Sequence, residues 1–159
     1  MKRMKRFCAF ALLLASLLAL AACGGAKQKD VPVSELSAAV ASALGQSDSF
    51  VPRDVMFLGL TKKTSAELGD YAVIASNQST NVDEIGIFKA GTMTAKDLQA
   101  AAEDYLAKRI ASWMDEYMPQ EKPKLTNAEV RVSGDYVMYA ILSDEDKATA
   151  FSAFENALK

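Results

Sequence analysis

Two short runs of carboxylates come closest in this sequence to a reactive or metal-binding pattern. Asp83-Glu84 stands where a strand begins and could hold a cation or act as an acid/base pair. Neighbouring residues of a strand point to opposite faces, so the two carboxylates would not converge, and we interpret them as solubilising charges. Asp144-Glu145-Asp146 opens a helix, where the helix dipole favours each acidic side chain by roughly 0.3–1 kcal/mol. Neither run has the spacing of an EF-hand loop, so no metal site is expected.

Arg109 is the basic residue best placed for a binding role. It lies close to the apolar stripe of a long helical segment, with Tyr105 and Trp113 four residues away on either side. Its guanidinium could stack on one of these rings, extend along the helix edge into solvent, or bind the carboxylate of an anionic ligand in a groove. An enzyme or solute-binding subunit built on such groups would need a cleft that joins Arg109 to Glu84 or Asp144.

Composition excludes other familiar catalytic arrangements. The chain contains no histidine, which removes imidazole-based catalysis and most zinc or copper sites. Serine and threonine hydroxyls therefore lack an imidazole to activate them, and neither Thr61-Lys-Lys63 nor Thr94-Ala-Lys96 matches the Ser-x-x-Lys pattern. The glycines form no phosphate-binding loop. We therefore expect a protein that is not an enzyme and that holds no cofactor.

Cys23 carries the one thiol whose surroundings predict a definite reaction. Residues 1–6 are largely basic, residues 7–20 are apolar, and Leu20-Ala21-Ala22-Cys23 resembles the bacterial lipobox. In a lipobox the cysteine thiol receives a diacylglyceryl group before the chain is cut, here between Ala22 and Cys23. The apolar run is too short to span a bilayer, which takes roughly 20 residues. We expect residues 1–22 to be a signal peptide and Cys23 to carry the lipid, the alternative being a plain secretory signal.

The length and charge of the mature chain limit its partners. Loss of 22 residues from 159 leaves 137, enough for one domain with a sizeable core. Because four basic residues and Cys8 leave with the signal, 14 basic and 20 acidic residues remain, a net charge of −6 with no disulfide. An acidic surface disfavours nucleic acid. Residues 23–32 lack periodicity and predict a flexible tether with a reach on the order of 17 Å, ahead of a single domain over 33–159.

The spacing of apolar residues predicts the elements that position these groups. A helix is expected over 34–44, between an N-cap at Ser34 and a stop at Gly45. Short helical turns are expected within 46–69, with a buried strand over 54–60 as the alternative. Strands are expected over 71–76, 84–90, 128–133 and 136–142. A helix of about 24 residues starts at the capping box of Thr94 and ends before Pro119, and a last helix follows Ser143. The turn Gly134-Asp135 pairs Val132 with Val137 and Val130 with Tyr139.

This order of elements predicts an α+β domain. We expect an antiparallel sheet of two hairpins with two long helices packed on one face, plus an N-terminal helix. The strand over 136–142 is apolar on both sides, with Val137, Tyr139 and Ile141 assigned to the core. Either the 34–44 helix and the segment around Phe57 cover its second side, or that side is exposed. If exposed, it would be an interaction face for a protein partner or a second copy, made of Tyr136, Met138, Leu142 and Phe88.

Three stretches carry a resemblance that spans roughly residues 32–158. They are Val82-Asp-Glu-Ile-Gly-Ile-Phe-Lys89, the long helix with Trp113 that ends near Tyr117-Met-Pro119, and Asn127 to Val137 with its Ser-Gly-Asp-Tyr-Val turn. Together they resemble the family of small Gram-positive lipoproteins catalogued as domain of unknown function 4358. The resemblance implies a lipid-anchored extracytoplasmic domain, and it implies no activity or catalytic residue.

We therefore expect a lipoprotein held by Cys23 to the outer side of the cell membrane, whose domain is a non-catalytic interaction or ligand-binding module. The alternative is a small enzyme or solute-binding subunit that uses carboxylate, lysine and arginine groups in a cleft.

Overall fold

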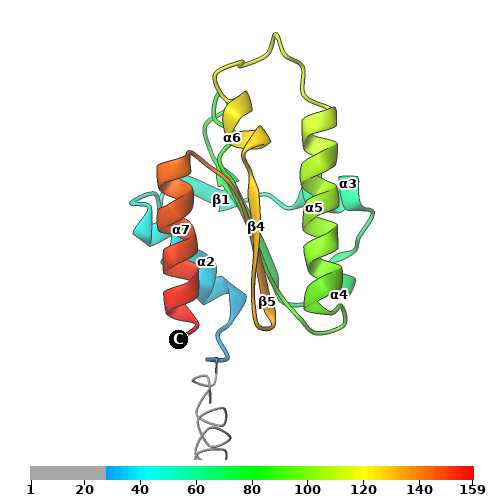
Figure 1. Ribbon diagram of the computed structural model, residues 1–159, viewed down its shortest axis with the longest axis vertical. Helices are drawn as coiled ribbons and strands as arrows, with labels where there is room; N and C mark the ends of the chain where they lie inside the picture. Colours follow the sequence, from blue (N-terminus) through cyan, green and yellow to red (C-terminus); the bar gives the residue numbers. More distant parts are fainter. Residues whose placement is uncertain (1–27) are drawn as a thin grey trace, which may run out of the picture.

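The computed structural model describes residues 28–159, which form six helices and five strands (Figure 1). Cys23, the cut after Ala22 and the signal peptide lie outside these residues. No helix in the described part of the chain has the length and apolar character needed to cross a membrane. The elements in chain order are α2 (Val33–Ala43), β1 (Phe50–Pro52), α3 (Val55–Thr61), α4 (Ser65–Leu68), β2 (Tyr71–Ser76), β3 (Glu84–Lys89), α5 (Ala95–Ala111), α6 (Lys122–Thr126), β4 (Glu129–Ser133), β5 (Tyr136–Ile141) and α7 (Asp144–Ala157).

The five strands form one antiparallel sheet in the order β1-β2-β3-β5-β4. The predicted register of the second hairpin is confirmed, since Val130 stands opposite Tyr139 and Val132 opposite Val137. Gly134 has a φ of 54°, a left-handed conformation that glycine adopts without penalty in a tight hairpin turn. The α+β class with an antiparallel sheet is thus confirmed, with β1 as a short additional edge strand.

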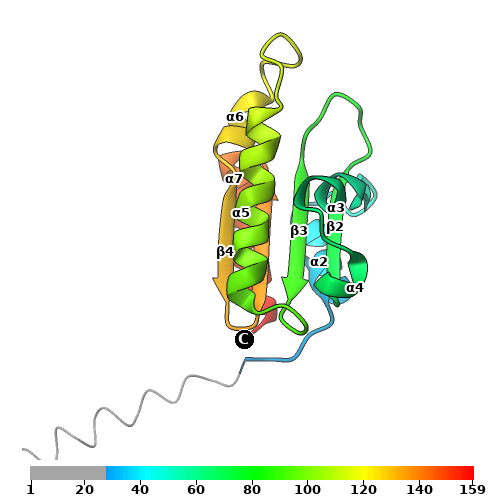
Figure 2. The ribbon, with the colours of Figure 1, turned by 90° about the vertical axis from the view of Figure 1, so that its right-hand side faces the viewer.

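Helices cover both faces of this sheet, where the sequence predicted the two long helices on one face. Helices α2 and α7 pack on one side, and α5 packs on the other with α3 and α4 (Figures 1 and 2). The physical reason is that the central strands β3 and β5 are buried along almost their whole length on both sides. A strand that is apolar on both faces needs a covering layer on each.

The prediction that Tyr136, Met138, Leu142 and Phe88 form an exposed interaction face is therefore wrong. Tyr136, Met138 and Leu142 are at most 2% exposed and lie under α2 and α7. Phe88 is fully buried on the opposite face, where the ring of Phe57 lies 4.9 Å from it. These four residues belong to two different core layers, and neither layer is open to a partner.

Two of the predicted helix starts are confirmed by their capping residues, whereas two other helix ends lie at different residues than predicted. The hydroxyl of Thr94 accepts the Asp97 N–H in a capping box, and that of Ser143 accepts the Asp146 N–H, both as predicted. By contrast α2 starts after Pro32 rather than Ser34. Helix α5 ends at Ala111, about six residues earlier than predicted, and the chain continues as the loop 112–121.

The first described residues are fastened to one end of the sheet. The side chain of Gln28 donates to the carbonyl of Ser133 at 2.7 Å and accepts the Asp135 N–H at 3.3 Å. The Val31 N–H donates to the Tyr136 hydroxyl at 2.8 Å, and Asp30 pairs with Lys89 at 2.5 Å. These contacts shorten the predicted tether, because residues 28–32 belong to the domain.

The two outer strands differ from the apolar centre of the sheet. Strand β1 has three residues and ends in Pro52, which has no N–H to offer a further strand. Strand β4 carries Glu129 and Arg131, which pair with each other and with charged residues of α7. The apolar core therefore lies under β2, β3 and β5.

Candidate functional site

A buried carboxylate, Glu84, is the centre of the most developed polar arrangement in the described residues. Glu84 begins β3 opposite Ile141 of β5, so its side chain enters the layer between the sheet and α5. Helix α5 presents Tyr105 and Arg109 to this layer, because residues four apart lie on the same side of a helix. Strand β5 contributes Tyr139. Three elements far apart in the sequence thus converge on one carboxylate.

Side chains of the cluster hydrogen-bond to both oxygens of the Glu84 carboxylate. The hydroxyls of Tyr105 and Tyr139 donate to Oε1 of Glu84 at 2.6 and 2.7 Å. Nη1 of Arg109 lies 3.0 Å from Oε2 of Glu84 and 2.7 Å from the Tyr105 hydroxyl oxygen. The side chains of Glu84 and Arg109 are only 5% and 11% exposed. Both carboxylate oxygens of Glu84 thus accept hydrogen bonds from side chains of the same domain.

Electrostatics favours the protonated forms of the two tyrosines and of the arginine in this cluster. Burial, and next the charge of Glu84, raise the pKa of the Tyr105 hydroxyl well above its ordinary value, and the same causes raise the pKa of Tyr139. Burial lowers the pKa of Arg109, but the charge of Glu84 and the contact with Tyr105 outweigh it, and the net shift is upward. Two neutral phenols and one guanidinium therefore donate to one carboxylate.

Aromatic rings separate this centre from solvent. Phe57 of α3 lies with its ring centroid 4.9 Å from that of Tyr105 and 5.9 Å from that of Tyr139. The Arg109 guanidinium lies 5.6 Å from the Tyr105 ring centroid, so stacking is the one of the three alternatives for Arg109 that this contact matches. Arg109 also forms an ion pair with Glu84. An enzyme or solute-binding subunit would need these two residues together in a cleft, whereas here the pair is almost fully buried.

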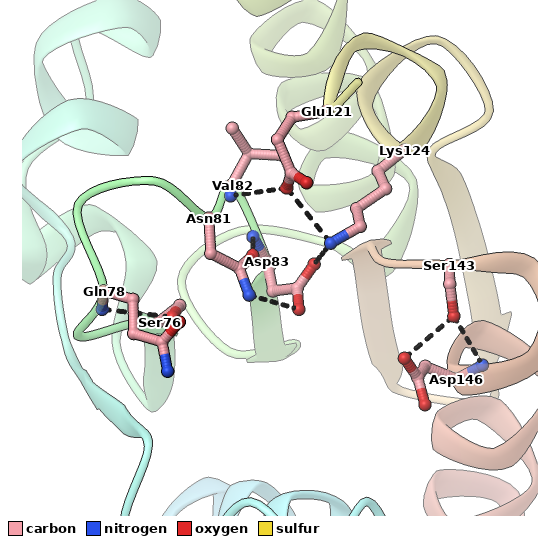
Figure 3. A network of polar contacts seen from close by, with 9 residues as sticks. All are labelled: Ser76, Gln78, Asn81, Val82, Asp83, Glu121, Lys124, Ser143 and Asp146. Carbon is pink, nitrogen blue, oxygen red and sulfur yellow. Dashed lines mark hydrogen bonds and ion pairs between the residues drawn. The ribbon is translucent and has the colours of Figure 1, made fainter. Parts of the chain in front are cut away.

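Asp83 belongs to a polar network separate from that of Glu84, and Figure 3 shows the network of Asp83. Its carboxylate accepts from Lys124 at 2.8 Å, and Lys124 also pairs with Glu121 at 3.0 Å. Glu121 in turn accepts the Val82 N–H at 3.2 Å. Burial lowers the pKa of Lys124, but its bonds to Asp83 and Glu121 together raise this pKa by more, so the net shift is upward. The expected divergence of Asp83 and Glu84 is confirmed, and Asp83 ties the loop before β3 to α6. Their interpretation as solubilising charges is wrong, because each residue is only 4% exposed.

The acidic run at the start of α7 is divided among local contacts. Asp146 accepts from the Ser143 hydroxyl at 2.8 Å, and Asp144 pairs with Lys147 at 3.0 Å (Figure 3 includes Ser143 and Asp146). Lys147 is buried and also bonds to the carbonyl of Asn127. Asp144 thus does not meet Arg109. Over residues 28–159, no three His, Cys, Asp or Glu side chains are grouped so that they could hold a metal ion.

Sequence reasoning named Glu84, Arg109 and Tyr105 but missed Tyr139 as their partner. One signal was available: Glu84 and Gly86 share a strand face, and a glycine there leaves room for a large neighbour. A Cβ on Gly86 would stand 2.1 Å from Cε1 of Tyr139. The hydroxyl of Tyr139 reaches Glu84 because its ring crosses β3 above this glycine.

The protein is thus a small α+β domain whose apolar core encloses one polar cluster around Glu84. A family model described as a domain of unknown function, DUF4358, matches residues 58–142, and the chain belongs to this family. The match runs from α3 to the end of β5 and includes all four members of the buried centre. Neither the curated proteins nor the solved structures contain a significant match.

Proposed function

We propose that this protein is a membrane-anchored extracytoplasmic lipoprotein whose domain is a non-catalytic interaction or ligand-binding module. One observation carries the second half of the proposal. The carboxylate, phenol and guanidinium groups that could do chemistry are bonded to one another inside the core. Such a cluster holds α5 on the sheet, which is a structural role. We therefore infer that the domain acts by binding a partner or ligand at its surface.

The anchor is supported by the sequence before the domain. Leu20-Ala21-Ala22-Cys23 has the lipobox pattern, and two acyl chains on one cysteine are sufficient for stable membrane attachment. The described domain begins at Gln28, five residues after Cys23, which corresponds to at most about 17 Å of extended chain. The domain would thus lie close to the bilayer.

The anchor is tested by labelling the full chain with a clickable palmitate analogue in the source cell. We expect label on the wild type, no label on Cys23→Ala, and loss of Cys23→Ala from the washed membrane fraction. Cys8→Ala is the matched control, because it removes the other thiol of the precursor and should leave labelling unchanged. Equal labelling of wild type and Cys23→Ala would reject the anchor.

A solute-binding role is the second candidate, and one groove favours it. An open groove of about 460 Å³ lies beside α2 and β2, and its lining includes Asp54, Asp70 and Tyr71. Tyr71 donates to Asp54 at 2.6 Å, and Asp70 accepts the Val33 N–H at 3.2 Å. Two carboxylates favour a cationic solute. A thermal-shift screen of polyamines and basic amino acids tests this role, with Asp54→Asn expected to remove any shift.

A further inference from the structure

The edge of the sheet at β2 is covered over only half of its length. Strand β1 pairs with residues 74–76, whereas β2 begins three residues earlier, at Tyr71. After β1 the Arg53 N–H donates to the carbonyl of Val73 at 2.9 Å, and the chain then continues into α3. In residues 28–159, no strand lies beside β2 from Tyr71 to Val73 on this side. We call these three residues the open edge.

Backbone groups of the open edge point outward from the sheet. The carbonyl of Asp70 accepts the Lys89 N–H, so the main chain of Asp70 faces β3. Main-chain groups alternate in direction along an antiparallel strand, so those of Tyr71 and Val73 face away from β3. The bond from Arg53 to the Val73 carbonyl agrees with this direction. The register thus leaves the N–H and carbonyl of Tyr71 and the N–H of Val73 without a strand partner in the described part of the chain.

The open edge lines the groove of about 460 Å³ beside α2 and β2. Ser34 and Ser37 of α2 also line this groove, and so does Pro52 at the end of β1. Ala72 and Ile74 contribute half-buried apolar side chains that pack against the core beneath α2. A row of outward backbone groups next to apolar side chains is the kind of surface to which an extended peptide adds as a strand.

The charge of the groove favours a basic occupant. Asp54 and Asp70 line the groove, and no lysine or arginine does. Neither carboxylate forms an ion pair with a lysine or arginine of the described residues, and the ammonium group of Lys89 pairs with Asp30 instead, at 2.5 Å. A second copy would bring the same two carboxylates to a symmetric contact, which is unfavourable. A segment with lysine or arginine side chains is complementary to this surface.

We propose that the open edge binds an extended, basic peptide segment of a partner protein, which adds to the sheet as a short strand. This inference rests on the proposed role as a ligand-binding module and names the class of ligand for the groove. Main-chain hydrogen bonds to Tyr71 and Val73 hold the segment, and Asp54 and Asp70 attract its basic side chains. A polyamine or a free amino acid offers the positive charge but lacks the row of peptide groups that a strand edge pairs with.

The test uses the full chain, purified in a mild detergent, and a fluorescent heptapeptide in which lysine and valine alternate. We expect the heptapeptide to bind, as measured by fluorescence anisotropy, and to bind more weakly at high salt. The same heptapeptide with N-methylated valines keeps its charge but cannot donate from these positions, so it should bind at least about tenfold more weakly. A glutamate/valine heptapeptide should not bind.

Two double variants of the protein separate the groove from the overall charge. Asp54→Asn with Asp70→Asn keeps an acceptor oxygen at each position and should weaken binding of the lysine/valine heptapeptide at least about fivefold. Glu103→Gln with Glu116→Gln is the matched control, because it removes two exposed carboxylates from α5 and the loop after it. This control should bind the heptapeptide like the wild type.

Hydrogen exchange resolved to single amides reads the pairing itself. The Tyr71 amide should exchange more slowly when the lysine/valine heptapeptide is bound. The amide of Val132, a 45% exposed residue of the other edge strand, should be unchanged.

The inference is overturned if the N-methylated heptapeptide binds like its parent, if exchange at Tyr71 is unaffected, or if the heptapeptide dissociates a dimer that pairs through this edge. A thermal shift with spermidine and no binding of the heptapeptide would also overturn it, but would leave the solute-binding role standing. Absence of binding by both probes would reject that role as well. Lipid labelling of Cys23 is measured separately, so the anchor does not depend on these results.

Discussion

The ring of Tyr139 lies directly over Gly86, with Cε1 2.1 Å from the position that a Cβ on Gly86 would take. Gly86 and Tyr139 are paired residues of β3 and β5. This close approach lets the Tyr139 hydroxyl reach Glu84, two residues earlier on the same face of β3, at 2.7 Å. A missing side chain on one strand therefore makes room for a buried hydrogen bond on the next.

Gly86→Ala should lower the free energy of unfolding by about 1–3 kcal/mol, because the added methyl group forces the Tyr139 ring out of position. The measurement is urea denaturation followed by circular dichroism. Gly59→Ala is the matched control, since no atom lies within 4 Å of a Cβ there. Gly59 lies inside α3, so alanine should stabilise the protein by about 0.5–1 kcal/mol. Equal effects of the two substitutions would contradict the packing described for β3.

Removal of Arg109 should be far more damaging than removal of its neighbour on α5. Arg109→Ala leaves the buried Glu84 without its cation and should cost about 3–5 kcal/mol. Lys108→Ala removes an exposed pair with Asp104 and should cost at most about 1 kcal/mol. The double variant Glu84→Leu with Arg109→Leu should be more stable than Arg109→Ala, because no unpaired charge remains. Thermal and urea denaturation distinguish these cases, and a mild Arg109→Ala phenotype would show that water reaches the centre.

Stability should fall as the pH rises above about 10. The pKa values of Tyr105 and Tyr139 are raised in the folded protein, whereas tyrosines of the unfolded chain ionise near pH 10. The folded state then holds more protons than the unfolded state, so the stability present below pH 10 is lost as the pH increases. Urea denaturation between pH 8 and 11 measures this loss, and the double variant Tyr105→Phe with Tyr139→Phe should flatten the dependence.

Gln28→Ala should loosen the end of the domain nearest to the proposed anchor. The variant loses the bonds of the Gln28 side chain to Ser133 and to the Asp135 N–H, at a cost of about 1 kcal/mol. Hydrogen exchange should be faster at the Asp135 amide. Gln78→Ala, at an exposed position at the opposite end, is the control and should change stability by less than about 0.5 kcal/mol. Unchanged exchange at Asp135 would mean that the turn is stable without this clamp.

Much of the fold was predictable because its determinants are local. Short runs rich in apolar and β-branched residues indicated β2, β3, β4 and β5, and the Gly134-Asp135 turn set the register of the last two strands. Capping residues Thr94 and Ser143 marked the starts of α5 and α7. The family was also recognisable from the Asp-Glu-Ile and Ser-Gly-Asp stretches, and the model match over residues 58–142 supports it.

The remaining errors come from long-range packing. Which face a helix covers depends on the whole sheet, so α5 and α7 were assigned to the same face when they lie on opposite faces. The apolar stripe through Trp113 and Tyr117 suggested a longer α5, because Trp113 does pack on the core although the helix has already ended. The Glu84 centre joins residues up to 55 positions apart, a distance over which spacing carries no information.

The outer strands have a consequence for how copies behave when they are crowded together. Proline at the end of β1 removes a backbone donor from that edge, and the charged side chains of β4 make it costly for an apolar strand to dock beside it. Edge-to-edge polymerisation, a common route to aggregation for β-containing domains, is therefore disfavoured at high local density.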